Sequence, residues 1–263
     1  MSQKNQAILL LCNHTTNAII DLFRKIHIAS GNTGDVYVLY HMDEKGVPAQ
    51  IKELHHIPFS SDIITKLNYF PIGFNLTPGN NHFPLLQFYL KAPKVYNYYW
   101  CIEEDVRFSG NWQYFFNSFS SITKDFISCH IRLSREEPLW HWWPSLAHPY
   151  TTIPFENRIR SFNPIYRISK EALGFIHEAL LSHWCGHHEV LFPTLLSQEG
   201  FEIMDFGGEG YFVPSEFVNK FYISSTTNKH GALQDGSMRW RPIFEEIGNE
   251  KNKLYHPVKD VDK

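Results

Sequence analysis

The chain has 263 residues, of which 43% are hydrophobic and 16% aromatic, and its formal net charge at pH 7 is -3. A chain of this length and apolar content can bury a substantial core, in one large domain or two small ones. The near balance of charge argues against bulk electrostatic binding to nucleic acid or to an acidic membrane surface.

The start of the chain and its cysteines indicate a compartment. Residues 1–6 lead directly into an apolar run, residues 7–12, which is too short for a transmembrane segment and is followed by no cleavage signal. No CxxC spacing occurs among the four cysteines, and three of them fall in expected strands, where a free thiol packs as a small apolar group: Cys12, Cys101, Cys129 and Cys185. We therefore expect a reducing compartment and, by default, a cytoplasmic protein.

The first 45 residues read as strand, helix and strand. The continuous apolar run 7–12 predicts a strand covered on both faces, and apolar residues at helical spacing follow up to about residue 29. Residues 35–40 form the next expected strand. Ligands of such parallel units bind beyond the carboxyl ends of the strands, which places Asn13, His14 and Asp43 near one crevice. No glycine fingerprint follows the first strand, so a dinucleotide is disfavoured and a nucleotide held in another way stays open.

Later segments continue the mixed pattern. We expect short strands near Ile57 and over residues 126–133, 163–168 and 201–206, and helices after residue 62 and over residues 83–90, 112–119 and 170–183. A further helix begins near residue 187, residues 71–82 and 139–154 read as loops, and residues 207–236 are loop-rich. The pattern predicts an α/β protein with a loop-rich second half.

An aromatic, apolar run ends abruptly at Glu103, Glu104 and Asp105. Strand alternation would put Glu103 and Asp105 on one face, where their oxygens could hold a divalent cation. Three carboxylates at the tip of a buried strand would repel one another without a cation. The alternative is a polar strand end that faces water.

Three further features of the second half each have two interpretations. The tryptophans Trp140, Trp142 and Trp143 form either a stacking platform for a sugar or a hydrophobic plug. Glu189, in the first turn of a helix, is either a functional carboxylate or an ordinary N-terminal acid. Arg241, in Arg239–Pro242, is either a diphosphate or acceptor contact or part of a surface turn. The adjacent His187 and His188 should point to different sides, which makes them a poor zinc pair.

In their order along the chain, Glu103-Glu104-Asp105, Glu189 and His256 resemble the landmarks of nucleotide-diphosphosugar glycosyltransferases of the GT-A fold, especially small bacterial members. The resemblance spans residues 7–259. It implies one Rossmann-like αβα sandwich over residues 1–263, with a mostly parallel central sheet. The nucleotide-sugar-binding half would cover about residues 7–133 and the acceptor-binding half about residues 134–259.

The resemblance also implies a function, the transfer of a sugar from a nucleoside-diphosphate donor to a saccharide or other hydroxyl acceptor. Asp105 and His256 would hold Mn²⁺ or Mg²⁺, and Glu189 would be the general base of an inverting reaction. The nucleotide sugar would contact Asn13, Asp43, Glu103, Glu104 and Arg241, and the acceptor would contact Trp140, Trp142 and Trp143. One departure from the family pattern is that the first acid is Glu103 rather than an aspartate.

Two other functions stay open. A sugar nucleotidyltransferase could use the same acidic strand end and would release pyrophosphate instead of a nucleoside diphosphate. A non-catalytic carbohydrate-binding or scaffold protein could retain a transferase-like fold, and Glu189 would then be dispensable.

Overall fold

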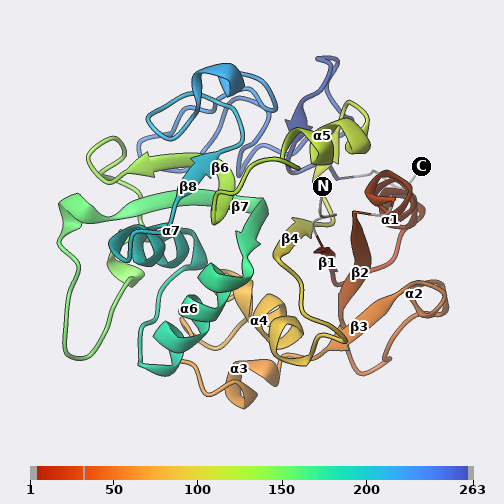
Figure 1. Cartoon of the computed structure of the whole chain (residues 1–263), viewed down its shortest axis with the longest axis horizontal. Helices are drawn as coiled ribbons and strands as arrows, with labels where there is room; N and C mark the ends of the chain where they lie inside the picture. The colour runs from red at the N-terminus through yellow and green to blue at the C-terminus, as the bar shows by residue number, and fades with distance from the viewer. Residues whose placement is uncertain (1–4, 32, 260–263) are drawn as a thin grey trace.

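A seven-stranded sheet with the strand order β3-β2-β1-β4-β7-β6-β8 runs through the computed structural model, which describes residues 5–31 and 33–259 (Figure 1). β1 pairs in parallel with β2 and β4, β2 with β3, and β6 with β8, whereas β7 is antiparallel to both of its neighbours. The strands are β1 (Gln6–Cys12), β2 (Gly34–His41), β3 (His56–Phe59), β4 (Tyr98–Glu103), β6 (Phe126–Leu133), β7 (Ile159–Ser169) and β8 (Ile203–Asp205). The predicted α/β class with a mostly parallel sheet is confirmed.

Helices cover both faces of the sheet. Alternate residues of β1 enter two hydrophobic cores, one on each face of the sheet. Ile8 and Leu10 pack in the core that includes α1 (Asn17–Ser30) and α5 (Trp112–Ser118). Ala7 and Leu9 pack in the core that includes α4 (His82–Lys91), α6 (Lys170–Leu181) and α7 (His188–Gln198). Because successive residues from Ala7 to Leu10 alternate between two apolar cores, residues 7–12 form a continuous apolar run instead of an alternating pattern.

The helix starts follow capping chemistry. Thr16 Oγ1 accepts a hydrogen bond from the backbone N–H of Ile19, and Ser169 Oγ accepts one from Ala172, as N-cap side chains do. The helix expected after residue 62 is the single turn α3 (Ile63–Lys66), and α2 (Ala49–Lys52) is equally short and was not predicted. Single 3₁₀ turns lie at Trp143–Ser145, Phe155–Asn157 and Ser215–Phe217. Among the residues described, no helix has the length and hydrophobicity that a membrane crossing requires.

The chain end returns to the middle of the sheet through a small ladder. β5 (Arg107–Phe108) pairs antiparallel with β9 (Leu254–Tyr255), and the backbone N–H of Val258 donates to the carbonyl of Asp105 at 2.9 Å. This ladder was not predicted, because two-residue strands have no periodicity to detect. It brings His256 beside the end of β4.

Three of the four cysteines lie in strands as predicted, Cys12 in β1, Cys101 in β4 and Cys129 in β6, and all three are buried. Residues 1–4, to which the expectation about a targeting segment partly refers, lie outside the described residues. The boundary near residue 133 between a nucleotide-sugar-binding half and an acceptor-binding half stays a prediction. A single sheet contains β6, which precedes this boundary, and β7 and β8, which follow it.

Candidate functional site

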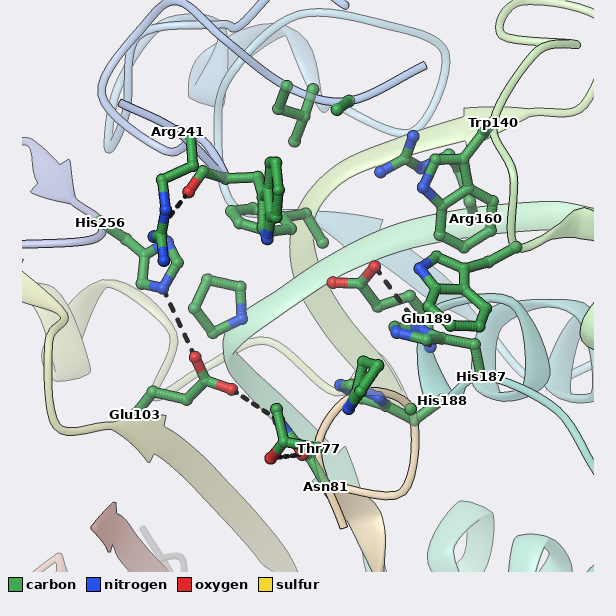
Figure 2. A pocket seen from close by; sticks show the side chains of 18 of the residues that line it. Thr77, Asn81, Glu103, Trp140, Arg160, His187, His188, Glu189, Arg241 and His256 are labelled. Carbon is green, nitrogen blue, oxygen red and sulfur yellow. Dashed lines mark hydrogen bonds and ion pairs between the residues drawn. The ribbon is translucent and has the colours of Figure 1, made fainter. Parts of the chain in front are cut away.

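A cavity of about 430 Å³ opens beyond the carboxyl end of β4. This volume lies within the range of about 300–1,000 Å³ that small-molecule sites occupy. Glu103, Arg241 and His256 lie at one end of the cavity, and Arg160 and Glu189 lie at the other (Figure 2). We call these the acidic end and the aromatic end, since His187 and two tryptophans, Trp140 and Trp142, line the second.

The acidic end is built by a turn rather than by strand alternation. β4 stops at Glu103, and the backbone N–H of Val106 donates to the Glu103 carbonyl at 3.1 Å. The prediction that Glu103 and Asp105 lie on one face of a strand was therefore wrong. Their carboxylates nevertheless approach each other, because the turn brings both to His256. Glu104 takes another direction, and its carboxylate lies 3.6 Å from His14 Nδ1.

His256 completes the acidic end. Its Nε2 lies 3.3 Å from Asp105 Oδ1 and 3.4 Å from Glu103 Oε2. Its Nδ1 donates to the carbonyl of Arg239 at 2.9 Å, which fixes the ring so that Nε2 faces the carboxylates. Burial alone would lower the pKa of His256, but the hydrogen bonds and charges of Asp105 and Glu103 raise it to about 10. Against the effect of its own burial, the pKa of Asp105 is lowered by His256 and by Lys259, whose Nζ lies 2.6 Å from Oδ2.

These residues fit a divalent cation. One oxygen or nitrogen from each of Glu103, Asp105 and His256 lies within 4.8 Å of the others. Two carboxylates and one imidazole are donors that suit Mn²⁺ or Mg²⁺. Asp105 Oδ1 is buried and has no well-aligned hydrogen-bond donor among the described residues, so it keeps a lone pair for a cation. A cation would displace the proton from His256 Nε2.

The structure also revises the prediction that repulsion among the three carboxylates requires a metal cation. The crowded carboxylates already have cationic neighbours of their own, His256 and Lys259. Lys259 and Asn81, whose Nδ2 donates to Glu103 Oε1 at 3.0 Å, were not among the predicted site residues. Asn81 lies in the loop expected over residues 71–82, where nothing in the local pattern distinguishes it from other turn residues.

A second cavity of about 220 Å³ adjoins the acidic end at the carboxyl ends of β1 and β2. Asn13 and Glu104, two of the residues predicted to contact the nucleotide sugar, line it together with His41. The His41 ring stacks on Phe59 with centroids 5.1 Å apart. Asp43 is not among its lining residues, because the Asp43 carboxylate accepts from the backbone N–H of Lys45 in an exposed turn.

Glu189 lies in the first turn of α7 and faces the cavity (Figure 2). Its Oε1 accepts from the backbone N–H of Asn163 at 3.1 Å. Burial raises the pKa of Glu189 to about 7, and the opposing influence of Arg160 and of that N–H does not cancel it. A carboxylate in this state can accept a proton near neutral pH.

The two adjacent histidines do not diverge, which corrects the prediction. His187 precedes the helix with φ -56° and ψ 128°, so the 100° rotation between consecutive helical residues does not apply to it. Its ring stacks on His188 with centroids 5.0 Å apart and on Trp142 at 4.6 Å. Burial lowers the pKa of both imidazoles, that of His188 to about 4, and His187 Nδ1 accepts from the backbone N–H of Glu189.

The three tryptophans do not all fit one interpretation, a stacking platform or a hydrophobic plug. Trp140 and Trp142 line the cavity, whereas Trp143 does not and donates from Nε1 to the carbonyl of Glu137 at 2.8 Å. Trp143 therefore packs as part of the hydrophobic plug. Arg241 is exposed in a surface bend and also lines the cavity, beside His256 at the acidic end (Figure 2).

No protein-family model and no curated protein sequence matches the chain. Among solved structures, the chain is similar in overall fold to sugar-nucleotide transferases. Glucosyl-3-phosphoglycerate synthase from Mycobacterium tuberculosis, in complex with Mn²⁺, UDP-glucose and phosphoglyceric acid, is 13% identical, with a TM-score of 0.45 over 77% of this chain and 69% of that one. Apo mouse xyloside xylosyltransferase 1 is 13% identical, with a TM-score of 0.41 over 77% and 85%.

A Bacillus anthracis protein described as a glucose-1-phosphate thymidylyltransferase, in complex with sucrose, is also similar, with 10% identity and a TM-score of 0.42 over 78% of this chain and 88% of that one. The similar structures thus include glycosyltransferases, which the resemblance in motif order predicts, and a nucleotidyltransferase. At these identities the function has to be inferred from the side chains of the site.

Asp105→Asn should weaken the binding of Mn²⁺ by at least about tenfold, because an amide oxygen of the same shape carries no charge for the cation. Titration of the purified protein with Mn²⁺, followed by the electron paramagnetic resonance of the free ion, measures the change. The matched control is Asp21→Asn, a change at an exposed aspartate on α1 that pairs with Arg24. Equal affinities in both variants would contradict the assignment of Asp105.

Proposed function

We propose that the protein is a metal-dependent glycosyltransferase that moves a sugar from a nucleoside diphosphate to a hydroxyl acceptor. One observation carries the proposal. A donor set for a divalent cation and a buried carboxylate that titrates near neutrality line opposite ends of one cavity, beyond the carboxyl ends of parallel strands. Ligands of doubly wound sheets bind at this edge.

The donor fits with its diphosphate at the acidic end. Glu103, Asp105 and His256 would hold the cation, which when bound neutralises the charge that develops on the departing diphosphate. Lys259 and Arg241 supply further positive charge to the same end. The nucleoside would enter the second cavity, where Asn13 and Glu104 offer polar groups and the stacked rings of His41 and Phe59 form a wall.

The transfer itself would be a single displacement. The acceptor oxygen forms a bond to the anomeric carbon while the bond from that carbon to the diphosphate oxygen breaks, and the nucleoside diphosphate leaves with the electron pair. The acceptor proton passes to the Glu189 carboxylate. Attack from the Glu189 side, opposite the leaving group, inverts the anomeric centre. The N–H of Asn163 holds Oε1 of Glu189 and leaves Oε2 for the proton.

A panel of nucleoside-diphosphate sugars, tested with and without Mn²⁺, should identify the donor by its effect on the melting temperature. A ligand at 100 times its Kd adds about 2.7 kcal/mol to the free energy of unfolding, so the true donor should stand out only when the metal is present. Chromatography of the products then separates the candidates. Release of a nucleoside diphosphate supports the proposal, release of pyrophosphate identifies a nucleotidyltransferase, and metal-dependent binding without turnover identifies a binding protein.

Glu189→Gln should lower kcat by about 10²- to 10⁴-fold, because the amide cannot accept the proton, while the donor-induced rise in melting temperature persists. Steady-state kinetics and thermal shift on the same preparation measure both. Glu178→Gln, an exposed position on α6, serves as the control for the same chemical change. A fully active Glu189→Gln enzyme would remove Glu189 from the mechanism.

The pH profile should follow the ionisation of Glu189. Only the carboxylate can act as the base, so kcat/KM for the acceptor should rise with pH and level off above about 7. Below that region the slope should approach about tenfold per pH unit, since one proton must be lost. The residual rate of Glu189→Gln should lack this rise. A profile that falls between pH 6 and 7 is incompatible with the assignment.

A further inference from the structure

One charged pair lies behind the aromatic end of the cavity. Arg160 lines the cavity, and its side chain is only 2% exposed. Its Nη1 donates to Glu137 Oε2 at 3.0 Å and to the carbonyl of Gly231 at 3.1 Å. The guanidinium lies 4.1 Å from the centre of the Trp140 ring. A guanidinium this deeply buried could bind an anionic ligand if its charge were free.

Its charge is not free, because Glu137 compensates it. The Glu137 side chain is 9% exposed, and its other oxygen, Oε1, accepts from His130 Nε2 at 2.6 Å. Burial opposes ionisation of this acid, but the hydrogen bond from His130 and the charge of Arg160 lower the pKa of Glu137. Burial lowers the pKa of His130 to about 4, so the imidazole is a neutral donor. Arg160 and Glu137 therefore form a pair without net charge.

The backbone is shaped to hold this pair. His130 has φ 50°, in the left-handed region, and lies within a register shift of β6 against β7, between Cys129 and Arg132. Such an irregularity redirects a side chain, here toward Glu137. Gly231 has φ 74°, and a Cβ there would lie 2.5 Å from the Cα of Trp140, so only glycine brings its carbonyl onto Arg160.

The imidazoles described at the aromatic end add no positive charge, and Arg132, another cation whose charge acts on Glu137 and Arg160, does not line the cavity. His187 and His188 have lowered pKa values through burial, and that of exposed His141 is lowered by desolvation and by Arg160. Two other cations line the cavity together with the metal-binding residues: Lys259, which pairs with Asp105, and Arg241, which lies at the acidic end (Figure 2). Glu189 contributes negative charge when it is ready to act as a base.

What the aromatic end does offer is an apolar wall. Trp142, which is partly exposed and stacks on His187, is the kind of ring that packs against the C–H face of a sugar, whereas Trp140 is 4% exposed and its ring lies against the Arg160 guanidinium. Arg160 Nε is buried and has no hydrogen-bond partner among the described residues.

On the basis of the function proposed above, we infer that the acceptor is an uncharged saccharide and that Glu137 excludes anionic acceptors by compensating Arg160. Removal of the Glu137 charge would leave a buried guanidinium at the aromatic end. Such a group would favour a sugar carrying a carboxylate or phosphate.

The test compares neutral saccharides with their uronate and phosphate counterparts as acceptors, in the presence of Mn²⁺ and the donor found by thermal shift. Wild-type kcat/KM should favour the neutral member of each pair by about tenfold or more. Glu137→Gln should move the ratio toward the anionic member by about tenfold, since the compensating charge is lost. Glu136→Gln, the same change at an exposed neighbour, should leave the ratio at its wild-type value.

The double variant Arg160→Met with Glu137→Gln separates charge from packing. It should keep the neutral preference, because no free cation remains, even if both variants melt at lower temperature. A wild-type preference for the anionic acceptors overturns the inference without any variant. A folded Glu137→Gln enzyme with an unchanged ratio also overturns it. If the inference fails but the enzyme hydrolyses a donor with water and releases a nucleoside diphosphate, the proposed function still stands. If no donor is turned over, the result counts against the proposed function itself.

Discussion

The contact between the C-terminal segment and the end of β4 creates the site. His256 reaches Asp105 and Glu103 only because β9 pairs with β5 and the N–H of Val258 donates to the carbonyl of Asp105. Two carboxylates held this close would destabilise the fold if they were left alone. Their imidazole partner comes from about 150 residues further along the chain, so the acidic end exists only in the folded protein.

From this contact follows an electrostatic division of the cavity. At the acidic end, His256 and Lys259 keep Asp105 ionised in spite of its burial, and at the aromatic end burial brings the pKa of Glu189 to about 7. Two carboxyl groups of one cavity therefore differ in what they can do. Asp105 can bind a cation over a wide pH range, and Glu189 can exchange a proton near neutrality. Carboxyl groups whose environments separate their pKa values in this way are suited to different roles in one reaction.

The sequence predicts the features that local chemistry determines. Several features can be predicted because each continues or interrupts a periodic pattern within a few residues. They are the strand over residues 7–12, the helix caps Thr16 and Ser169, and the acids that follow Tyr98–Ile102. The ladder of β5 and β9 is not visible, since two residues have no period. β7 was expected to begin at Asn163, yet it begins at Ile159, because Arg160 interrupts the apolar pattern that marks a buried strand.

Arg160 shows why part of the site could not be predicted. A buried charge is tolerated only with a partner, and its partners Glu137 and Gly231 come from loops without periodicity. In the sequence, each of these residues resembles a surface or turn residue. Their role becomes visible only when the fold brings them into contact. Glu189 was visible because it lies in the first turn of a helix, but its charge state is set mainly by its burial, which Arg160 and the N–H of Asn163 oppose. The carboxylate proposed as the base can therefore be guessed from local sequence, whereas the environment that sets its pKa arises only from tertiary packing.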